Sequence, residues 1–154
     1  MAALLLSTTV NKVDKKGRVS VPASFRTLLT AQGFNGVVVF RSISHPALEG
    51  WGIEQMEGLA KGIEAFNPFS EKRDDFAFSI LADAAQLPFD PEGRILLPEK
   101  FLAHAKISEN AAFVGRGKSF QIWDPGTFDA LQDEARARAR EGKEELKLPM
   151  GGGS

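Results

Sequence analysis

The side chains of this sequence best suited to binding chemistry are cations that crowd into residues 11–18. That stretch carries Lys12, Lys15, Lys16 and Arg18 against one carboxylate, Asp14. Lysine ammonium groups pair with phosphate oxygens, and one arginine can donate two hydrogen bonds to N7 and O6 of a guanine. A two-stranded loop is narrow enough to approach the major groove of DNA. The stretch therefore predicts contact with the phosphates and bases of double-stranded DNA.

The core of this stretch recurs later in the chain at a constant offset of 76 residues. Asp14, Gly17, Arg18, Pro22 and Phe25 correspond to Asp90, Gly93, Arg94, Pro98 and Phe101. Matching positions at a fixed spacing indicate an internal duplication. The second copy lacks the excess of positive charge, because in residues 87–94 only Arg94 opposes Asp90 and Glu92. Arg94 is therefore a weaker candidate for a DNA contact than Arg18.

The Asp-x-x-Gly part of each copy predicts a tight turn. An aspartate at the first position of a type I turn accepts hydrogen bonds from later backbone amides, and a glycine at the fourth position adopts the positive φ that other residues resist. Asp14 and Gly17 fit these places, and Asp90 and Gly93 fit them in the second copy. Both copies are expected to be hairpins of the type I plus bulge kind. The turn itself does not require the arginine that follows, which leaves that side chain for binding.

Strands and short helices must position these turns. Apolar, β-branched residues predict strands before and after each turn, and a proline then opens a short helix with apolar residues at helical spacing. In the first copy these elements are expected at residues 4–13, 19–21 and 22–33, followed by strands at 36–41 and near 47–48. In the second copy they are expected at residues 87–89, 95–97, 98–102, 111–114 and 121–123. The predicted unit is strand, turn, strand, helix, strand, strand.

Helical sequence separates and follows the two copies. Apolar residues keep helical spacing from 53 to 66, Asn67-Pro68 interrupts the pattern, and Ser70 can cap a second helix. Pro125 opens a last helix with Phe128 facing inward. That helix ends in an alternating run of alanine and arginine, and the arginines suit the negative end of a helix dipole. Contact of these arginines with nucleic acid or with a neighbouring subunit is the alternative.

These elements predict one domain over residues 1–148 and a flexible tail at 149–154. The domain is expected to consist of a first repeat at 4–52, inter-repeat helices at 53–84 and a second repeat at 85–148. Its composition, 43% hydrophobic and 25% charged, is typical of a globular protein. A chain of 154 residues is long enough to bury one core.

Charge and composition exclude several classes of function. The net charge is −1, so a role in DNA binding must depend on a local cationic patch. Without cysteine there is neither a disulfide nor a cysteine zinc site. The apolar start at residues 1–6 is too short for a signal peptide or a membrane span. The chain is therefore expected to act in the cytoplasm and to have no membrane partner.

Residues for catalysis are scarce. His45 precedes a proline and His104 falls on a short apolar helix, so packing or capping is expected of both. Asp14 and Asp90 can be imagined as the carboxylate pair of an acid hydrolase, but both already have roles in turns. No catalytic or metal-binding residue, no cofactor and no small-molecule substrate is predicted.

A resemblance to a known family covers residues 4 to 148. The sequence resembles the MraZ family of bacterial transcriptional regulators, which is related to the AbrB-like swapped-hairpin transcription factors. The resemblance rests on the two Asp-x-x-Gly-Arg motifs, the Val-Ser-Val-Pro at 19–22, the His-Pro-x-Leu-Glu-Gly-Trp at 45–51 and the Phe-Val-Gly to Phe-Gln-Ile-Trp stretch at 113–123. One such motif is a weak signal, whereas two at this spacing are specific.

The resemblance implies a mainly β fold with helices. It implies a double-split β-barrel of the AbrB/SpoVT-like swapped-hairpin kind, made by two internal repeats, with inter-repeat and C-terminal helices. It also implies a sequence-specific DNA-binding regulator of the division and cell-wall gene cluster, including its own promoter. The family's DNA-binding arginine corresponds to Arg18 and Arg94, and Lys12, Lys15 and Lys16 are the expected phosphate contacts. Family members form rings, so a nucleoid-associated homo-oligomer that reads tandem DNA repeats is expected.

Two other functions stay open. One is an antitoxin-like protein-interaction module of the swapped-hairpin fold, and the other is a small hydrolase. Antidotes of this fold usually supply one hairpin per chain and a disordered acidic tail. This sequence has two copies of the motif and no such tail.

Overall fold

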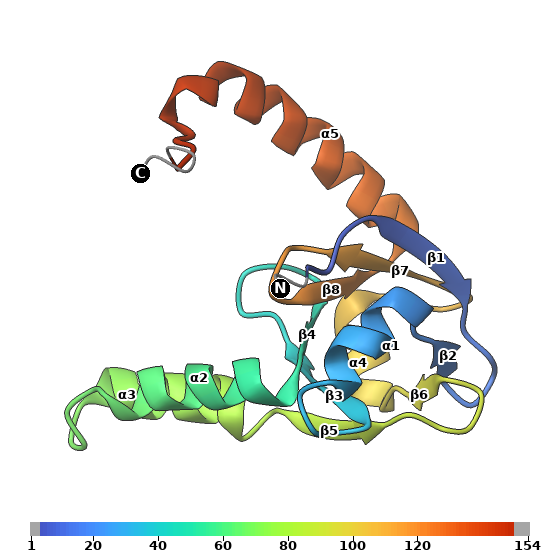
Figure 1. The fold of residues 1–154 in the computed structure, drawn as a ribbon, viewed down its shortest axis with the longest axis horizontal. Helices are drawn as coiled ribbons and strands as arrows, with labels where there is room; N and C mark the ends of the chain where they lie inside the picture. Colours follow the sequence, from blue (N-terminus) through green and yellow to red (C-terminus); the bar gives the residue numbers. More distant parts are fainter. Residues whose placement is uncertain (1–3, 150–154) are drawn as a thin grey trace.

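Two antiparallel sheets organise the computed structural model, which describes residues 4–149 (Figure 1). The larger sheet has six strands in the order β1-β7-β8-β4-β3-β5, and the smaller pairs β2 with β6. The strands are β1 (Thr8–Lys12), β2 (Arg18–Ser20), β3 (Gly36–Arg41), β4 (Leu48–Trp51), β5 (Ala85–Pro88), β6 (Arg94–Leu96), β7 (Asn110–Gly115) and β8 (Phe120–Trp123). The β-rich fold agrees with the expectation, but strand pairing within residues 4–149 does not close a barrel.

The same order of elements occurs twice, in a first segment at residues 8–51 and a second segment at residues 85–123. Within each segment only the last two strands pair with each other, β3 with β4 and β7 with β8. All other pairs join the segments: β1 with β7, β5 with β3, β4 with β8 and β2 with β6. The two segments therefore complete each other's sheets.

This exchange corrects the expectation of two local hairpins. The strands on either side of the first turn meet only at an isolated bridge between Val13 and Val19. Beyond that bridge they diverge toward β7 and β6. Periodicity fixes which residues face the core, but it does not say which strand lies alongside, so the partner was predicted wrongly from local sequence.

Two short helices cover the core beside the turns. Helix α1 (Ala23–Thr30) follows Pro22 and helix α4 (Glu99–Ala105) follows Pro98, as the sequence predicts. Each inserts a fully buried phenylalanine, Phe25 or Phe101, into the central cluster between the sheets. Strand β3 carries four consecutive apolar residues at 37–40 that are all buried, and it lies inside the sheet between β4 and β5.

The sequence between the segments forms a helical arm that protrudes from the sheets (Figure 1). Helix α2 (Ile53–Glu64) ends before the Asn67-Pro68 break, and Ser70 caps α3 (Glu71–Phe76), which continues into a π-helical turn at Ala77–Leu81. Both features confirm the sequence prediction. The arm packs on Val38 and Phe40 of β3 in a separate apolar cluster.

An ion pair secures the base of this arm. The buried carboxylate of Asp83 accepts hydrogen bonds from the Arg41 backbone amide (2.9 Å) and guanidinium (2.6 Å). Burial opposes ionisation, but the hydrogen bonds from Arg41 outweigh it and hold the pKa of Asp83 below its usual value. Nothing in the sequence pattern pointed to this pair.

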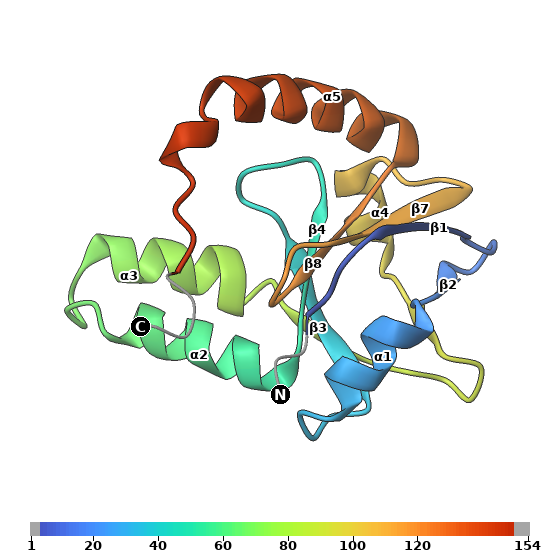
Figure 2. The same cartoon turned by 45° about the horizontal axis from the view of Figure 1, so that its top comes forward.

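The last helix, α5 (Pro125–Glu141), begins at the Asp124 cap and runs away from the sheets (Figure 2). Phe128 is buried against β7 and β8, as predicted, and the distal arginines are exposed. Most of the expected flexible tail lies outside the described residues. No helix within residues 4–149 is long and apolar enough to cross a membrane.

Candidate nucleic-acid interface

Both Asp-x-x-Gly turns have the predicted geometry. The Gly17 amide donates to the Asp14 carbonyl oxygen (3.0 Å), and the Gly93 amide donates to the Asp90 carbonyl oxygen (2.9 Å). Both glycines have a positive φ, +93° and +80° respectively. L-residues with a Cβ are strained in this region, so each turn requires its glycine.

The aspartate side chain organises the loop from inside. Oδ1 of Asp14 accepts hydrogen bonds from the backbone amides of Lys16 and Arg18, both at 2.9 Å. Oδ1 of Asp90 accepts the equivalent bonds from Glu92 and Arg94 at the same distances. Each carboxylate therefore satisfies two amides that a tight turn leaves without partners in a strand ladder.

The second carboxylate oxygen holds the arginine. Nε of Arg18 donates to Oδ2 of Asp14 (2.7 Å), and Nε of Arg94 donates to Oδ2 of Asp90 (2.8 Å). The arginine, which the sequence analysis treated as a residue left over from the turn, is therefore a hydrogen-bonding partner of the turn aspartate. Each arginine is part of the turn through its inner nitrogen, while the terminal nitrogens point beyond the ion pair.

These contacts shift the ionisation of the carboxyls. Hydrogen bonds from the backbone amide and side chain of Arg18 lower the pKa of Asp14 from 3.8 to about 2, against a smaller effect of burial. The backbone amide of Arg94 is likewise the main cause that lowers the pKa of Asp90. The hydrogen bond to Asp90 raises the pKa of Arg94. Both pairs are charged at neutral pH.

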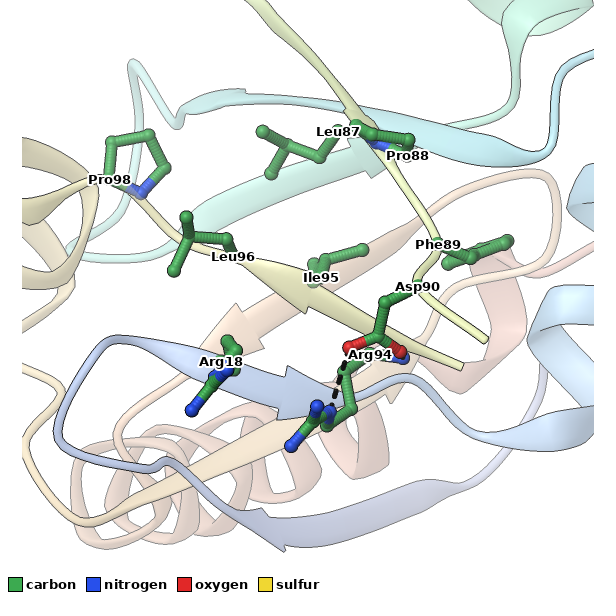
Figure 3. Close-up of a pocket in the computed structure, with 9 residues that line it drawn as sticks. All are labelled: Arg18, Leu87, Pro88, Phe89, Asp90, Arg94, Ile95, Leu96 and Pro98. Carbon is green, nitrogen blue, oxygen red and sulfur yellow. Dashed lines mark hydrogen bonds and ion pairs between the residues drawn. The ribbon is translucent and has the colours of Figure 1, made fainter. Parts of the chain in front are cut away.

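The pairing of β2 with β6 brings the two arginines onto one surface. Arg18 lies opposite Leu96, and Ser20 lies opposite Arg94. Paired residues share a face and neighbours along a strand alternate, so these four side chains lie on one face. The intervening Val19 and Ile95 occupy the opposite face and are buried. Figure 3 shows Arg18 and Arg94 on adjacent strands with their guanidinium groups extending to the same side.

The lysines of the first turn border the same surface. Lys12 and Lys15 line a groove of about 520 Å³ with Arg18 and Arg94. Lys16 lines a neighbouring groove of about 510 Å³ on the other side of the loop. All three lysine side chains are exposed. The structure therefore brings the predicted cations of both segments to one region.

The two arginines differ in what surrounds them. Within residues 4–149, the terminal nitrogens of Arg18 have no hydrogen-bonding partner, whereas Nη2 of Arg94 lies 3.4 Å from Oε1 of Glu92. Glu92 occupies the position that Lys16 has in the first turn. A carboxylate there competes with any anion that approaches Arg94.

The sequence did not point to other members of this surface. Asn11 donates from Nδ2 to the Ser20 carbonyl oxygen (2.7 Å) and ties β1 to β2 beside Arg18. Ser108 and Glu109 line the same groove from the turn before β7. Only the alternation of Val19, Ser20 and Val21 could have identified Ser20 as facing outward. The role of Asn11 depends on the contact of β1 with β2, and the positions of Ser108 and Glu109 depend on contacts between segments.

The histidines have structural roles, as predicted. Nε2 of His104 lies 3.2 Å from the His45 carbonyl oxygen, and the His45 ring packs 5.4 Å from the ring of Trp123. Within the described range, no group of three or more His, Asp or Glu side chains could hold a metal ion.

Comparison with known proteins identifies similar chains. A family model for MraZ protein, antitoxin-like, matches residues 80–148. The transcriptional regulator MraZ of Pelagibacter ubique (strain HTCC1062) is 47% identical over 144 residues, which cover 94% of this chain and 93% of that protein. The transcriptional regulator MraZ of Rickettsia canadensis (strain McKiel) is 46% identical over 138 residues, which cover 90% and 93%. These names describe regulators and not enzymes, in agreement with the expectation from the sequence.

Proposed function

The chain belongs to the MraZ family, and on that premise we propose that it is a transcriptional regulator that binds double-stranded DNA through the face carrying Arg18 and Arg94. The observation that supports this most is the register of β2 and β6, which sets both arginines on one face. A chain of net charge −1 gains a local cationic surface in this way, with Lys12, Lys15 and Lys16 at its borders.

The aspartates make each arginine a preorganised donor. With Nε held by Asp14, the guanidinium of Arg18 has one orientation, and its terminal nitrogens are available to a base edge or a phosphate. Fixing the side chain before binding reduces the entropy lost in the complex. A bidentate contact to guanine needs two such nitrogens in one plane.

The first turn is the stronger DNA contact. Lys15 and Lys16 add positive charge next to Arg18, whereas Glu92 pairs with Arg94 and adds negative charge. Phosphate binding responds to this local balance. Arg18, Lys15 and Lys16 therefore provide most of the affinity, Lys12 contributes at the edge, and Arg94 has a smaller part.

The two segments correspond to an internal duplication that lets one chain imitate a dimer of single-motif relatives. The shared element order and the exchanged strand pairing support this interpretation. In it, the two sheets correspond to parts of a double-split barrel, with residues 1–148 forming one DNA-binding domain.

The working species is a homo-oligomer, with a ring as its expected form, that reads short DNA elements in tandem. One loop touches only a few base pairs, and joining identical protomers raises avidity by about 10² to 10⁴ without new contacts. The helical arm supports self-association because Phe69 is 97% exposed and Phe78 is 70% exposed. Light scattering should give one mass several times 16.7 kDa.

The expected targets are the promoter of its own gene and the division and cell-wall gene cluster, which places the protein at the nucleoid in the cytoplasm. A gel shift on the DNA just upstream of its own gene, with unrelated competitor DNA present, tests the proposal. Retarded bands that persist under competition and strengthen with tandem elements support it. No band, or one that competitor removes completely, contradicts it.

The antitoxin-like description of the family model favours a second candidate, a protein-interaction module. The two candidates differ in the surface they use. A regulator needs the exposed cations of the first turn, whereas a protein-interaction module can bind a partner without them. If the gel shift fails while the oligomer is intact, the second candidate is preferred.

A further inference from the structure

Two grooves lie at equivalent places in the two segments, one beside each turn. The groove of the first segment, between β1 and β2, has a volume of about 520 Å³. The groove of the second segment, between β5 and β6, has a volume of about 710 Å³ (Figure 3). At the offset of 76 residues, Lys12 and Ser20 of the first groove correspond to Pro88 and Leu96 of the second, and Asn11, beside the first groove, corresponds to Leu87. Equivalent positions therefore carry polar residues in one groove and apolar residues in the other.

The polar groove is partly closed by its own side chains. Asn11 donates to the Ser20 carbonyl oxygen across the gap between β1 and β2. Neither Leu87 nor Leu96 has a side-chain donor, so the gap between β5 and β6 has no such tie. Its walls are Leu87, Pro88, Phe89, Ile95, Leu96 and Pro98. Leu96 is 54% exposed, an apolar surface that a ligand can cover.

Cations line the apolar groove as well. Arg18 and Arg94 both contribute to it, the first from β2 and the second from β6 (Figure 3). Asp90 also lines it, but its charge is already paired with Arg94. A groove of this volume lies within the range of small-molecule sites, about 300 to 1,000 Å³. Apolar walls with guanidinium groups beside them match a ligand that has an aliphatic part and an anionic head.

We propose that the groove between β5 and β6 binds a small amphipathic anion, a carboxylate or phosphate monoester on an aliphatic chain, as an effector. The chain lies against Leu87, Phe89 and Leu96, and the head pairs with Arg18. No bond is made or broken, so the ligand is not a substrate.

The site also predicts regulation, and this part rests on the proposed function. Arg18 cannot pair with an anionic head group and with DNA at the same time. Ligand and DNA therefore compete for one guanidinium, and each lowers the apparent affinity for the other by the same factor. The protein would release its DNA when the anion is abundant.

Isothermal titration of the full chain with decyl phosphate, below its critical micelle concentration, tests the site without DNA. Saturable binding of one decyl phosphate per chain is expected, with much weaker binding of decanol, which lacks the anion, and of inorganic phosphate, which lacks the chain. Equal binding of decanol would show that no anion site exists. Equal binding of inorganic phosphate, or no saturable binding of decyl phosphate, would also overturn the proposal.

Matched variants locate the site. Leu96→Asp places a carboxylate in the groove and should raise the dissociation constant about tenfold or more, because small changes in an apolar pocket already have effects of this size. Val10→Asp is the control, since Val10 is 53% exposed on β1 outside the groove. If Leu96→Asp does not fold, Leu96→Ser replaces it, because serine is the counterpart residue of the first segment. Unchanged binding in a folded Leu96 variant contradicts the assignment.

A competition experiment separates the two proposals. Decyl phosphate should displace labelled promoter DNA from the wild type but not from Leu96→Ser, which retains Arg18 and adds no charge to the DNA-binding face. If decyl phosphate binds and the protein never binds DNA, the groove assignment stands and the proposed function fails. If DNA binds but decyl phosphate neither binds nor displaces it, the groove assignment fails and the proposed function stands.

Discussion

Each arginine of the two turns works together with an aspartate four residues earlier. The carboxylate uses one oxygen to order the loop amides and the other to hold Nε of the arginine. A change at Asp14 therefore affects both the loop shape and the direction of Arg18. Separating these effects requires substitutions that remove one and keep the other.

Asp14→Asn provides that separation. An asparagine can still accept hydrogen bonds from the Lys16 and Arg18 amides through Oδ1, but its Nδ2 cannot accept from Nε of Arg18. The melting temperature should fall less than in Asp14→Ala, because asparagine keeps the loop hydrogen bonds and loses only the negative charge and the bond to Nε. DNA affinity should fall about tenfold, the size of one base contact. Asp14→Ala should lose both loop order and affinity. Equal DNA affinities of wild type and Asp14→Asn would exclude a positioning role for the carboxylate.

The Asp14 carboxylate also sets the acid response of the loop. Its folded pKa of about 2 lies below the usual 3.8, so its stabilising effect is complete above pH 3.8 and is lost as the pH falls toward 2. The NMR shift of the Lys16 amide should follow this titration with a midpoint near pH 2 in the wild type. Asp14→Asn should show no such transition. A midpoint near 3.8 would mean that the carboxylate does not make these hydrogen bonds when the protein is in solution.

The sequence predicted where the helices and strands lie along the chain better than it predicted which strands pair. The turns, the helices after Pro22 and Pro98, and the apolar strand β3 are visible in local patterns because each depends on residues close in sequence. The exchange of strands between segments is not, since period-two alternation looks the same whichever strand lies alongside. For the same reason the shared face of Arg18 and Arg94 appeared only with the register of β2 and β6.

The two turn glycines should differ in their tolerance of alanine. Both have a positive φ, but a Cβ at Gly17 would lie 2.8 Å from the backbone oxygen of Leu97, whereas a Cβ at Gly93 would meet only the flexible side chain of Arg26. Gly17→Ala should therefore lower the free energy of unfolding more than Gly93→Ala. Each substitution should lower the free energy of unfolding by at least about 1 to 2 kcal/mol, the cost of a left-handed conformation for a residue with a Cβ. Urea unfolding of both variants measures this, and a larger loss in Gly93→Ala would be contrary to the structure.

At the scale of the whole molecule, the exchanged strands make the two segments one cooperative unit. Two linked side-chain hydrogen bonds join strands at the centre of the large sheet. The side chain of Gln121 on β8 donates to Glu49 on β4 (2.8 Å), and the indole of Trp123 donates to Gln121 (2.8 Å). Gln121 is buried, so losing β4 would leave its amide without a partner. Neither segment can unfold while the other keeps its sheet.

Two tryptophans report on this cooperativity. Trp51 packs against the helical arm and Trp123 against α5, in separate apolar clusters. Variants that keep only one of them, Trp51→Phe and Trp123→Phe, should each show a urea midpoint from fluorescence that coincides with the midpoint from far-UV circular dichroism, because unfolding is two-state. If the fluorescence midpoint of either variant clearly differs from the dichroism midpoint of the same variant, the segments unfold separately.

The most direct test of DNA binding by the shared arginine face is fluorescence anisotropy of a labelled duplex from the region upstream of the gene. Four proteins are compared at one salt concentration: wild type, Arg18→Ala, Arg94→Ala and Arg140→Ala, the last being an exposed arginine of α5. Arg18→Ala should weaken binding about tenfold or more, Arg94→Ala should weaken it less, and Arg140→Ala should match the wild type. If a folded Arg18→Ala binds the duplex as tightly as the wild type, this face does not read DNA.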